Sequence, residues 1–395
     1  MYLATNLHAQ TVGPQTSPSP YHDETAFLAL LDSIAARRDE IDQLRHVPRD
    51  IVAQMKAAGI FRAATPQRFG GSGMPPAQFL SLIERIGMVD GSAAWVAAFG
   101  SGNTYIAALP ESAQAEIYAD GPDQVFAGGL YPLHKAERVE GGWKVSGRWR
   151  FASGCKGADW IGVGLELPAE EGKAAVASMA VCPASEVEII ENWHVLGMQG
   201  TGSHDTALED KFFPDNWICQ RGAKGIYDDP LYKYPPLAFQ AEVHAAVNLG
   251  LAQAAIDLAK EMSGGAKLMP GAAKLANRAY FCTELAKSEA KLRAARLFFY
   301  AEAEAAWADL LASGKVSLER TTLLRLSATY AAHGAAEVIQ TCYRIVGMAA
   351  IQRQHRMQQL LRDCLVVTQH AALSEATLEQ AGGLLAGLPA TAGFP

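Results

Sequence analysis

The sequence predicts an α+β fold, mostly α, with a strand-rich segment between two helical ones. Residues 24–120 show the apolar spacing of helices, residues 122–220 show strand-like alternation, and residues 236–385 are alanine-rich and helical again. With 395 residues, of which 49% are hydrophobic and 19% charged, the chain can bury a large core. The domains expected from these changes are a flexible tail (1–22), an N-terminal helical domain (23–121), a central β domain (122–235) and a C-terminal helical bundle (236–395).

The N-terminal part begins with a polar stretch, residues 1–22, whose proline and serine content is typical of a loose tail. Phe27, Leu30 and Ile34 then recur at intervals that place them on one face of a helix. A second apolar stripe ends at Gly59, a residue type that commonly stops helices. Further helices are expected at 76–88 and 93–109.

The central segment has the two-residue period of strands. Residues 143–151 alternate between apolar and polar side chains after a glycine turn at 140–142, as a half-buried strand does. Apolar runs at 160–165 and 177–181 and a further alternating run at 206–213 add strands. Several short strands separated by turns are typical of a small sandwich or barrel.

The C-terminal segment contains four stretches that are long enough to cross a helical bundle. Bundles of such helices usually pack antiparallel with short connections, so a four-helix bundle is expected. The four stretches are 237–262, 272–307, 319–346 and 357–380.

The composition excludes several functions. A net charge of −7 offers no basic surface to nucleic acid. No apolar run approaches the roughly 18 residues of a membrane span, and the N-terminus lacks the pattern of a secretion signal. The six cysteines are far apart, without a C-x-x-C pair, so we expect neither a metal site nor a disulfide framework, and a location in the reducing cytoplasm. The glycine runs do not match the G-x-G-x-x-G of a dinucleotide-binding fold.

Two turns rich in glycine and hydroxyl residues carry the strongest functional signal. The first ends the run 147–154 (Gly-Arg-Trp-Arg-Phe-Ala-Ser-Gly), which begins as a predicted strand. The second lies in the run 193–205, between predicted strands, and contains Thr201, Gly202 and Ser203. Turns of this kind bring backbone N–H groups and hydroxyls close to a flat polar ligand.

Both runs resemble motifs of the acyl-CoA dehydrogenase superfamily, and they look most like its branch of two-component, flavin-dependent monooxygenases. The first is similar to the family pattern G-x-W-x-[I/F]-[S/T]-[S/N]-G, and the second to W-x-x-x-G-[ML]-[RQ]-G-T-G-S-x-D. The resemblance covers residues 25–385 and implies that Ser153 is a catalytic residue at the flavin N5 edge. Ala152 departs from the pattern, because the family often has a hydroxyl there. The flavin-binding residues that the resemblance implies are Trp149, Phe151, Ala152, Ser153, Gly154, Thr201, Gly202 and Ser203.

A third motif lies near the C-terminus. Dehydrogenases of the family place a catalytic glutamate in a Tyr-Glu-Gly-Thr turn here, and this sequence has no such turn. Residues 361–373 instead resemble the monooxygenases, whose Arg-Asp…His pattern sets a histidine over the flavin, which implies that His370 is catalytic. In one continuous helix, Arg362 and His370 would be about two turns apart and near one face. A neutral imidazole there can stabilise reacting oxygen or accept a proton, while Arg362 and Asp363 are expected to brace neighbouring structure.

The resemblance also implies a substrate pocket. Trp95 belongs to a helix whose aromatic edge approaches the flavin in the family, and His134 belongs to a loop expected at 131–134 beside the flavin ring. Asn103 stands where phenol-hydroxylating relatives carry a histidine, which argues against a phenolic substrate.

Together these motifs imply the oxygenase component of a two-component monooxygenase. A separate flavin reductase would supply reduced FMN or FAD by diffusion, O₂ would form a C4a-hydroperoxyflavin, and one oxygen atom would pass to a small organic substrate, expected to be aromatic. We expect a cytoplasmic homotetramer without a metal ion or a nucleic-acid or membrane partner. Two alternatives remain open: an acyl-CoA dehydrogenase with tightly bound FAD, with Glu375 and Glu379 as the nearest candidate bases, and a non-catalytic scaffold.

Overall fold

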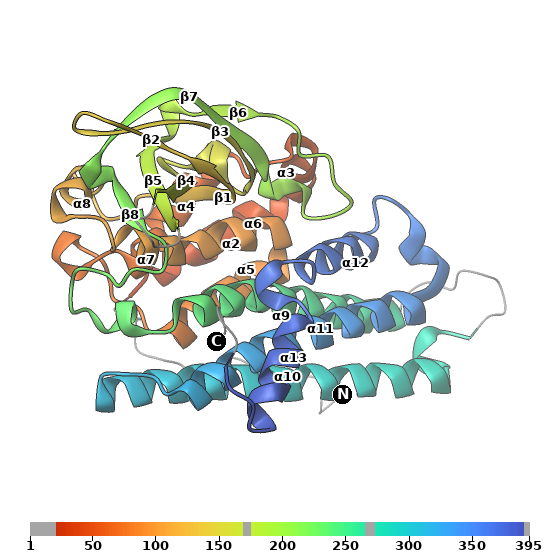
Figure 1. Cartoon of the computed structure of the whole chain (residues 1–395). Helices are drawn as coiled ribbons and strands as arrows, with labels where there is room; N and C mark the ends of the chain where they lie inside the picture. The colour runs from red at the N-terminus through yellow and green to blue at the C-terminus, as the bar shows by residue number, and fades with distance from the viewer. Residues whose placement is uncertain (1–20, 169–174, 265–272, 391–395) are drawn as a thin grey trace.

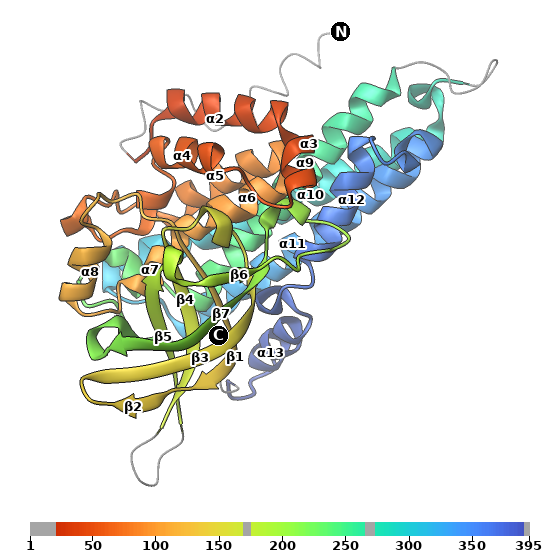
Figure 2. The ribbon, with the colours of Figure 1, turned by 90° about the horizontal axis from the view of Figure 1, so that it is seen from above.

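The protein combines N-terminal helices, a central sheet and a C-terminal bundle, which confirms the predicted fold class. The computed structural model describes residues 21–168, 175–264 and 273–390, so most of the tail predicted over 1–22 lies outside the described residues. Figure 1 shows the sheet domain on one side of the long C-terminal helices, and Figure 2 shows the N-terminal helices beside the sheet. Within the described residues, no helix has the length and apolar character that crossing a bilayer requires.

The first helix, α2, forms as its apolar spacing predicts. It buries Phe27, Leu30 and Ile34 on one face. Asp23 caps its N-terminus, since the Asp23 carboxylate accepts a hydrogen bond from the Ala26 N–H at 3.0 Å. The N-terminal helices are α2 (Glu24–Ala36), α3 (Arg38–Leu44), α4 (Arg49–Ala57), α5 (Pro76–Val89), α6 (Gly91–Ala98), α7 (Asn103–Ile106) and α8 (Glu111–Ile117).

The helix expected over 93–109 is in fact two shorter helices, α6 and α7. A tight 3₁₀ turn, Phe99–Gly102, separates them, and its two glycines disfavour a continuous α-helix. Helix α6 is buried along its whole length. Asp90 caps it by accepting a hydrogen bond from the Ala93 N–H at 2.8 Å.

The strands form one eight-stranded sheet in the order β6-β7-β3-β1-β4-β5-β8, with β2 paired to β3. The pairs are antiparallel except for β1 with β4, and the order has two ends, so the described strands form an open sheet. Residues 131–134 lie in β1 rather than in the expected loop, because Tyr131 pairs with Arg150 of β3. The strands are β1 (Phe126–Lys135), β2 (Glu137–Val139), β3 (Gly142–Ala152), β4 (Trp160–Leu167), β5 (Val176–Pro183), β6 (Glu188–Ile190), β7 (His204–Pro214) and β8 (Ile218–Gln220).

The C-terminal bundle is built around α11, which packs along both α9 and α10. The single helix expected over 357–380 was wrong. Helix α12 ends at Val367, and α13 starts only at Ala376, so the residues between them form a turn and a short 3₁₀ helix. The helices are α9 (Pro236–Ser263), α10 (Ala279–Ser313), α11 (Leu318–Val346), α12 (Arg356–Val367) and α13 (Ala376–Leu385).

Two glycines bring the N-terminal helices close to the bundle. A Cβ on Gly250 of α9 would lie 2.8 Å from the Cα of Gly87 in α5, and one on Gly87 would lie 2.9 Å from the Val247 carbonyl oxygen. Only glycine allows such a backbone approach. The contact fixes α9 against α5 and thereby against α6, which follows α5 directly.

Candidate active site

The two predicted turns lie side by side. Strands β3 and β7 are antiparallel neighbours, so the turn that follows β3 meets the turn that precedes β7. The Gly154 N–H donates a hydrogen bond to the Thr201 carbonyl oxygen at 2.7 Å. The hydroxyl oxygens of Ser153 and Ser203 are 2.6 Å apart. The fold therefore joins residues from both motifs into one polar cluster.

The hydroxyl groups of this cluster have a defined direction. A carbonyl oxygen only accepts, so the Thr201 hydroxyl donates to the Met198 carbonyl at 2.8 Å. Thr201 then has no second proton, and the Ser203 hydroxyl must donate to it across 2.7 Å. The Ser153 hydroxyl must in turn donate to Ser203 across 2.6 Å. The chain leaves Ser153 Oγ with free lone pairs, so toward a ligand this oxygen can only accept a hydrogen bond.

Phe151 lies at a distortion of β3 beside this cluster. The pairing of β3 with β7 shifts register between Trp149 and Ala152, and Phe151 has a φ of 63°, in the left-handed region. The Phe151 side chain is 65% exposed, and its ring meets the Trp193 ring edge-on at 6.2 Å. Bulges and strained residues are common beside functional sites. This one turns an aromatic ring outward two residues before Ser153.

Two of the predicted flavin-binding side chains are core residues instead. Trp149 and Ala152 are both 0% exposed, so neither side chain can reach a ligand. The Trp149 indole donates to the Gly164 carbonyl oxygen at 2.7 Å and ties β3 to β4. The register shift between Trp149 and Ala152 and the left-handed φ of Phe151 break the strand alternation, so Phe151 points outward while Trp149 and Ala152 both point inward. Both side chains pack in the core next to the turn.

A second cluster consists of three aromatic rings from three segments. Trp95 lies on α6, His244 on α9, and His370 in the turn after α12. The two imidazole rings stack at 4.1 Å with an interplanar angle of 28°. The Trp95 ring lies 4.1 Å from the His244 ring and 5.5 Å from the His370 ring. The fold thus brings Trp95 and His370 together, as the predicted site requires.

The position of His370 on a helix face was wrong. Helix α12 ends at Val367, so the argument from two helical turns after Arg362 does not apply. His370 has extended backbone angles and begins a 3₁₀ turn, where its Nδ1 accepts a hydrogen bond from the Ala372 N–H at 3.3 Å. The His333 Nε2, which lies 2.9 Å from the Leu373 carbonyl, braces the same turn. These tertiary contacts outweigh the helical periodicity of the sequence.

His244 is the residue that sequence reasoning missed. It lies in an alanine-rich helix whose side chains were expected only to pack. Its side chain is 3% exposed, and its Nδ1 lies 2.6 Å from the Gln240 carbonyl oxygen. The available signal was Glu242, His244 and Asn248, three polar residues in an apolar stretch of α9 whose buried residues are otherwise apolar.

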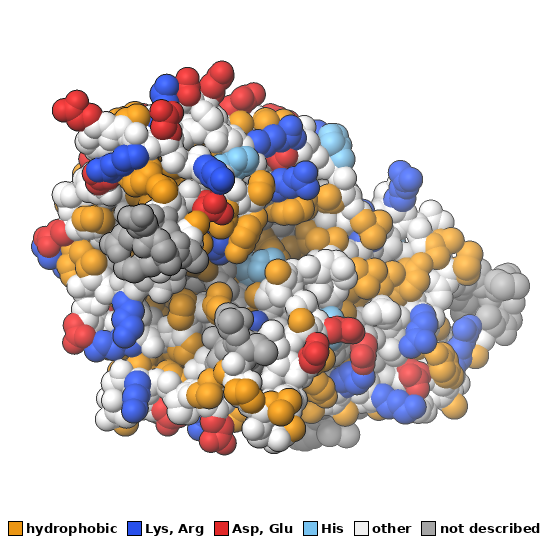
Figure 3. Space-filling view, in the orientation of Figure 1, with side chains coloured by type: hydrophobic (Ala, Val, Ile, Leu, Met, Phe, Trp, Pro, Cys, Tyr) orange, Lys and Arg blue, Asp and Glu red, His pale blue; other side chains and the backbone are white. Residues whose placement is uncertain are grey.

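Helix α6 lies between the two clusters. An added Cβ on Gly154 would lie 3.5 Å from Val96, and one on Gly200 would lie 2.9 Å from Ser92, so both turns pack on the helix that carries Trp95. Figure 3 shows a hollow with largely apolar walls between the sheet domain and α12, with histidine atoms visible at its edge. The hydroxyl chain and the aromatic rings therefore lie in one region of the fold, around α6.

Helix α12 holds the second turn in place through Arg362 and Asp363. The Asp363 carboxylate accepts a hydrogen bond from the Met198 N–H at 2.6 Å, and the Arg362 guanidinium donates to the Leu196 carbonyl at 2.7 Å. Between these bonds, a Cβ on Gly197 would lie 2.4 Å from the Arg362 carbonyl carbon, so only glycine fits. The Arg-Asp pair thus braces the loop that carries Thr201.

Several charged groups surround this brace. Asp363 is 4% exposed, and burial, with the nearby charge of Asp90 as the second cause, raises its pKa to about 7. Burial also raises the pKa of Asp90 and of Asp42. Burial lowers the pKa of Arg356 to about 10, and its guanidinium donates to the Met88 carbonyl at 2.9 Å. The brace is therefore sensitive to pH near neutrality.

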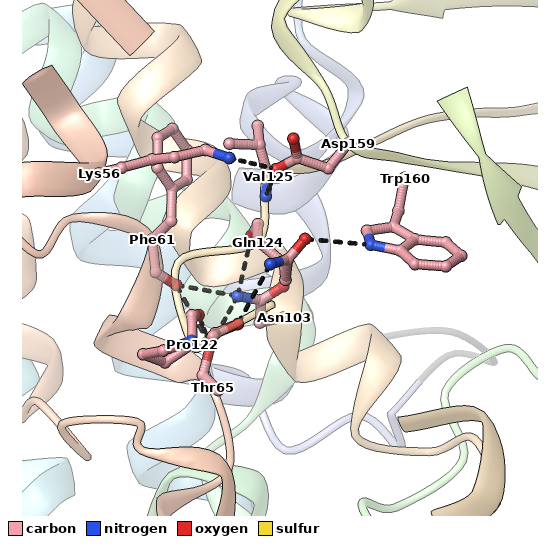
Figure 4. Close-up of polar contacts among 10 residues, drawn as sticks. Lys56, Phe61, Thr65, Asn103, Pro122, Gln124, Val125, Asp159 and Trp160 are labelled. Carbon is pink, nitrogen blue, oxygen red and sulfur yellow. Dashed lines mark hydrogen bonds and ion pairs between the residues drawn. The ribbon is translucent and has the colours of Figure 1, made fainter. Parts of the chain in front are cut away.

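Asn103 is not part of the pocket. Its side chain is 0% exposed, and its amide nitrogen donates to the Phe61 carbonyl and to Thr65 Oγ1, each at 2.9 Å. Figure 4 shows this amide enclosed by Phe61, Thr65 and Gln124. The assignment to the pocket came from a position in the family's pattern, whereas the side chain here ties α7 to the 3₁₀ helix Phe61–Ala64 and to Thr65. Asn103 therefore gives no information about the substrate.

His134 lies on the sheet, apart from both clusters. Its ring packs edge-on against Trp149 at 5.1 Å, and its Nε2 lies 3.0 Å from the Arg148 carbonyl oxygen. The contacts of the described residues do not join His134 to Trp95, Ser153 or His370. The strand conformation of residues 131–134 accounts for this placement, since β1 carries them along β3.

The hydrogen bonds and ring contacts of Trp95, His244 and His370 among the described residues include no carboxylate. Glu375 and Glu379 are exposed, at and after the start of α13. The buried Glu242 faces Tyr234, whose hydroxyl donates to it at 3.1 Å, and burial raises the Glu242 pKa well above its ordinary value. This carboxyl group is sealed in the core.

Comparison with known proteins identifies the family. The profile for the acyl-CoA dehydrogenase N-terminal domain matches residues 25–120, and that for the C-terminal domain matches residues 242–375. An indole-3-acetate monooxygenase from Pseudomonas putida is 44% identical over 371 residues, which cover 93% of this chain and 95% of the relative. The oxygenase component of an FADH₂-dependent resorcinol hydroxylase from Rhizobium sp. is 27% identical, over 85% of this chain and 86% of the relative.

A solved structure agrees with these relatives. The 3-HSA hydroxylase from Rhodococcus sp. RHA1 superposes with a TM-score of 0.85 at 25% identity, covering 93% of this chain and 97% of the other. The monooxygenase relatives support the monooxygenase over the dehydrogenase and scaffold alternatives. The chain belongs to the acyl-CoA dehydrogenase superfamily and is a flavin-dependent monooxygenase of its oxygenase-component branch.

Proposed function

We propose that this oxygenase binds reduced flavin against Ser153 and oxygenates an aromatic substrate beside Trp95, His244 and His370. When bound, a reduced flavin, either FMNH₂ or FADH₂, supplies the two electrons that activate O₂. Ser153 and His370 are the proposed catalytic residues. Phe151, Gly154, Thr201, Gly202 and Ser203 are the proposed flavin-binding residues.

The observation that carries this proposal is the direction of the hydroxyl chain. Ser153 Oγ can only accept, because its own proton goes to Ser203 at 2.6 Å. The reduced flavin has an N–H at N5, which donates, whereas N5 of the oxidised ring is an acceptor. An acceptor facing N5 thus favours the reduced ring, which suits an enzyme that receives its flavin already reduced.

The residues fit such a ring in two further respects. The three hydroxyl residues are nearly buried, with Ser153 6% exposed, Ser203 5% and Thr201 1%. Water therefore does not compete for their hydrogen bonds. The exposed Phe151 ring offers an apolar surface next to them. A site of this kind excludes water from the reacting atoms, which an oxygenase requires.

The substrate in this proposal is a small aromatic molecule of the indole type. The relative that is 44% identical is named for indole-3-acetate. The second cluster supplies the matching environment, because Trp95 is 8% exposed and its flat ring packs beside the stacked pair of imidazoles.

The proposal includes a cytoplasmic homotetramer that receives its flavin by diffusion from a separate reductase. All six cysteines are free thiols, which supports a reducing compartment. Large apolar side chains stay exposed on the long bundle helices, with Leu297 73%, Leu311 59% and Tyr330 47% exposed, which supports subunit contacts there.

Anaerobic titration with reduced and oxidised FMN and FAD tests the site. The wild-type protein is expected to bind the reduced form at least about tenfold more tightly, the effect of one well-placed hydrogen bond. In Ser203→Ala the Ser153 hydroxyl is free to donate. The ratio of the affinities for reduced and oxidised flavin should therefore fall several-fold. Ser146→Ala is the control, because this exposed serine on β3 bonds Asp210 and lies outside the cluster. Equal affinities in the wild type, or an unchanged preference in Ser203→Ala, would contradict the proposal.

A further inference from the structure

The stacked imidazoles of His244 and His370 carry their ring protons on opposite nitrogens. His244 Nδ1 lies 2.6 Å from the Gln240 carbonyl oxygen. Because this oxygen only accepts, Nδ1 of His244 carries the proton, and its Nε2 keeps a lone pair. His370 is reversed, since its Nδ1 accepts from the Ala372 N–H at 3.3 Å. In the neutral ring of His370, Nε2 therefore carries the proton.

Both rings are neutral near pH 7. Burial lowers the pKa of His370 to about 4. Burial, with the neighbouring His370 as the second cause, lowers the pKa of His244 well below its ordinary value. The backbone partners therefore fix which nitrogen holds each proton, and the pair presents one acceptor and one donor.

Neither Nε2 has a hydrogen-bond partner among the residues that the structure describes. His244 is 3% exposed, and its Nε2 is not among the fully enclosed polar atoms without a partner in the described residues. This nitrogen therefore faces accessible space, where a ligand can reach it. The lone pair of His244 thus indicates a ligand that donates to it.

The surrounding rings define the shape of that ligand. Trp95 lies 4.1 Å from His244 at an angle of 46° and meets His370 edge-on at 5.5 Å. The three rings come from α6, α9 and the turn after α12, which meet beside the sheet domain (Figure 1). Aromatic walls with one acceptor suit a flat ring that carries a single N–H or O–H.

Building on the proposed function, we propose that His244 is a substrate-binding residue whose Nε2 accepts the ring N–H of an indole-type substrate. The Nε2–H of His370 then stays free to donate to the reacting oxygen. His244 thus orients the substrate ring, and His370 donates a hydrogen bond to the reacting oxygen. A phenolic O–H offers the same kind of donor, so the test must separate indole-type substrates from phenolic ones.

Two matched pairs of probes test the inference by calorimetry on the protein loaded anaerobically with reduced FMN. The first pair is indole-3-acetate and benzofuran-3-acetate, which differ only in the ring N–H. The second is 4-hydroxyphenylacetate and 4-methoxyphenylacetate. We expect indole-3-acetate to bind about tenfold to a hundredfold more tightly than its oxygen analogue, because the analogue leaves the buried acceptor unpaired. A preference confined to the phenol pair would overturn the indole assignment, and equal affinities in both pairs would overturn the role of His244. Failure of both donor-bearing probes to bind would overturn the inference as well.

Variants assign the effect to one residue. His244→Phe keeps a stacked ring without an acceptor, so both indole probes should bind with equal affinity. His244→Gln restores an acceptor oxygen and should recover part of the preference. His134→Phe is the control, because this histidine packs on Trp149 away from the cluster. A preference that survives in His244→Phe would refute the inference, and if that variant does not fold, the wild-type comparison decides alone.

The same samples separate this inference from the proposed function. Binding of reduced flavin is measured first in each variant. If the preference for reduced flavin holds but the probes show no difference, only the role of His244 fails. If the preference for reduced flavin is absent, the proposed flavin site fails.

Discussion

Replacing His370 with alanine is expected to lower product formation by about 100-fold or more, while reduced flavin is still consumed. The imidazole is the group of the aromatic cluster whose Nε2–H remains available as a donor, since its Nδ1 is held by Ala372. Burial keeps its pKa at about 4, so the ring is neutral across the working range of pH. Without that donor, electrons from the flavin should leave as H₂O₂ rather than enter the substrate. Chromatography of the product and a peroxidase assay for H₂O₂ measure the two fates.

The control for this experiment is His134→Ala, a histidine on β1 that packs against Trp149. Its ratio of product to H₂O₂ should match the wild type. His370→Ala should also keep its affinity for reduced flavin, because the hydroxyl chain at Ser153 is untouched. An unchanged ratio of product to H₂O₂ in His370→Ala would remove this residue from the chemistry.

Asp363→Asn is expected to make the protein more stable than the wild type above pH 7 and equally stable near pH 4. Burial raises the pKa of Asp363 from an ordinary 3.8 to about 7, so the folded state holds this proton over a range where the unfolded chain has lost it. Stability of the wild type therefore falls as pH rises from about 4 to about 7, by roughly 4 kcal/mol for this group. Asparagine keeps an oxygen for the Met198 N–H and carries no charge. Urea unfolding at pH 5 and pH 8.5 measures the difference.

Asp363→Ala separates charge from hydrogen bonding. It removes the acceptor for the Met198 N–H, so it should destabilise the protein at both pH values relative to Asp363→Asn. If the difference between wild type and Asp363→Asn stays the same at pH 5 and pH 8.5, the buried carboxyl group does not titrate as described.

Local patterns in the sequence predicted much of the fold. The alternation at 143–151 gave β3, and the spacing of Phe27, Leu30 and Ile34 gave the buried face of α2. The first strand was missed, because Gly128, Gly129 and Pro132 are residues that usually mark turns. Its conformation depends on pairing with β3 and β4, which no local pattern contains.

The motifs pointed to contacts between segments far apart in the sequence, whereas contacts without a motif were missed. Ser153 and Ser203 are in contact, as the two motifs suggested, and His370 lies against Trp95. The break after α12 was not visible, because apolar spacing continues through the turn that contacts from His333 hold. His244 was hidden in an alanine-rich helix, where its stacking on His370 depends on two helices meeting.

The most direct test of the account is a crystal structure of the protein with reduced FMN, prepared without oxygen. We expect the flavin N5 within about 3 Å of Ser153 Oγ, with the ring extending past α6 toward His370 and Trp95. A flavin bound with N5 away from Ser153, or with His370 and Ser153 on separate surfaces, would contradict it.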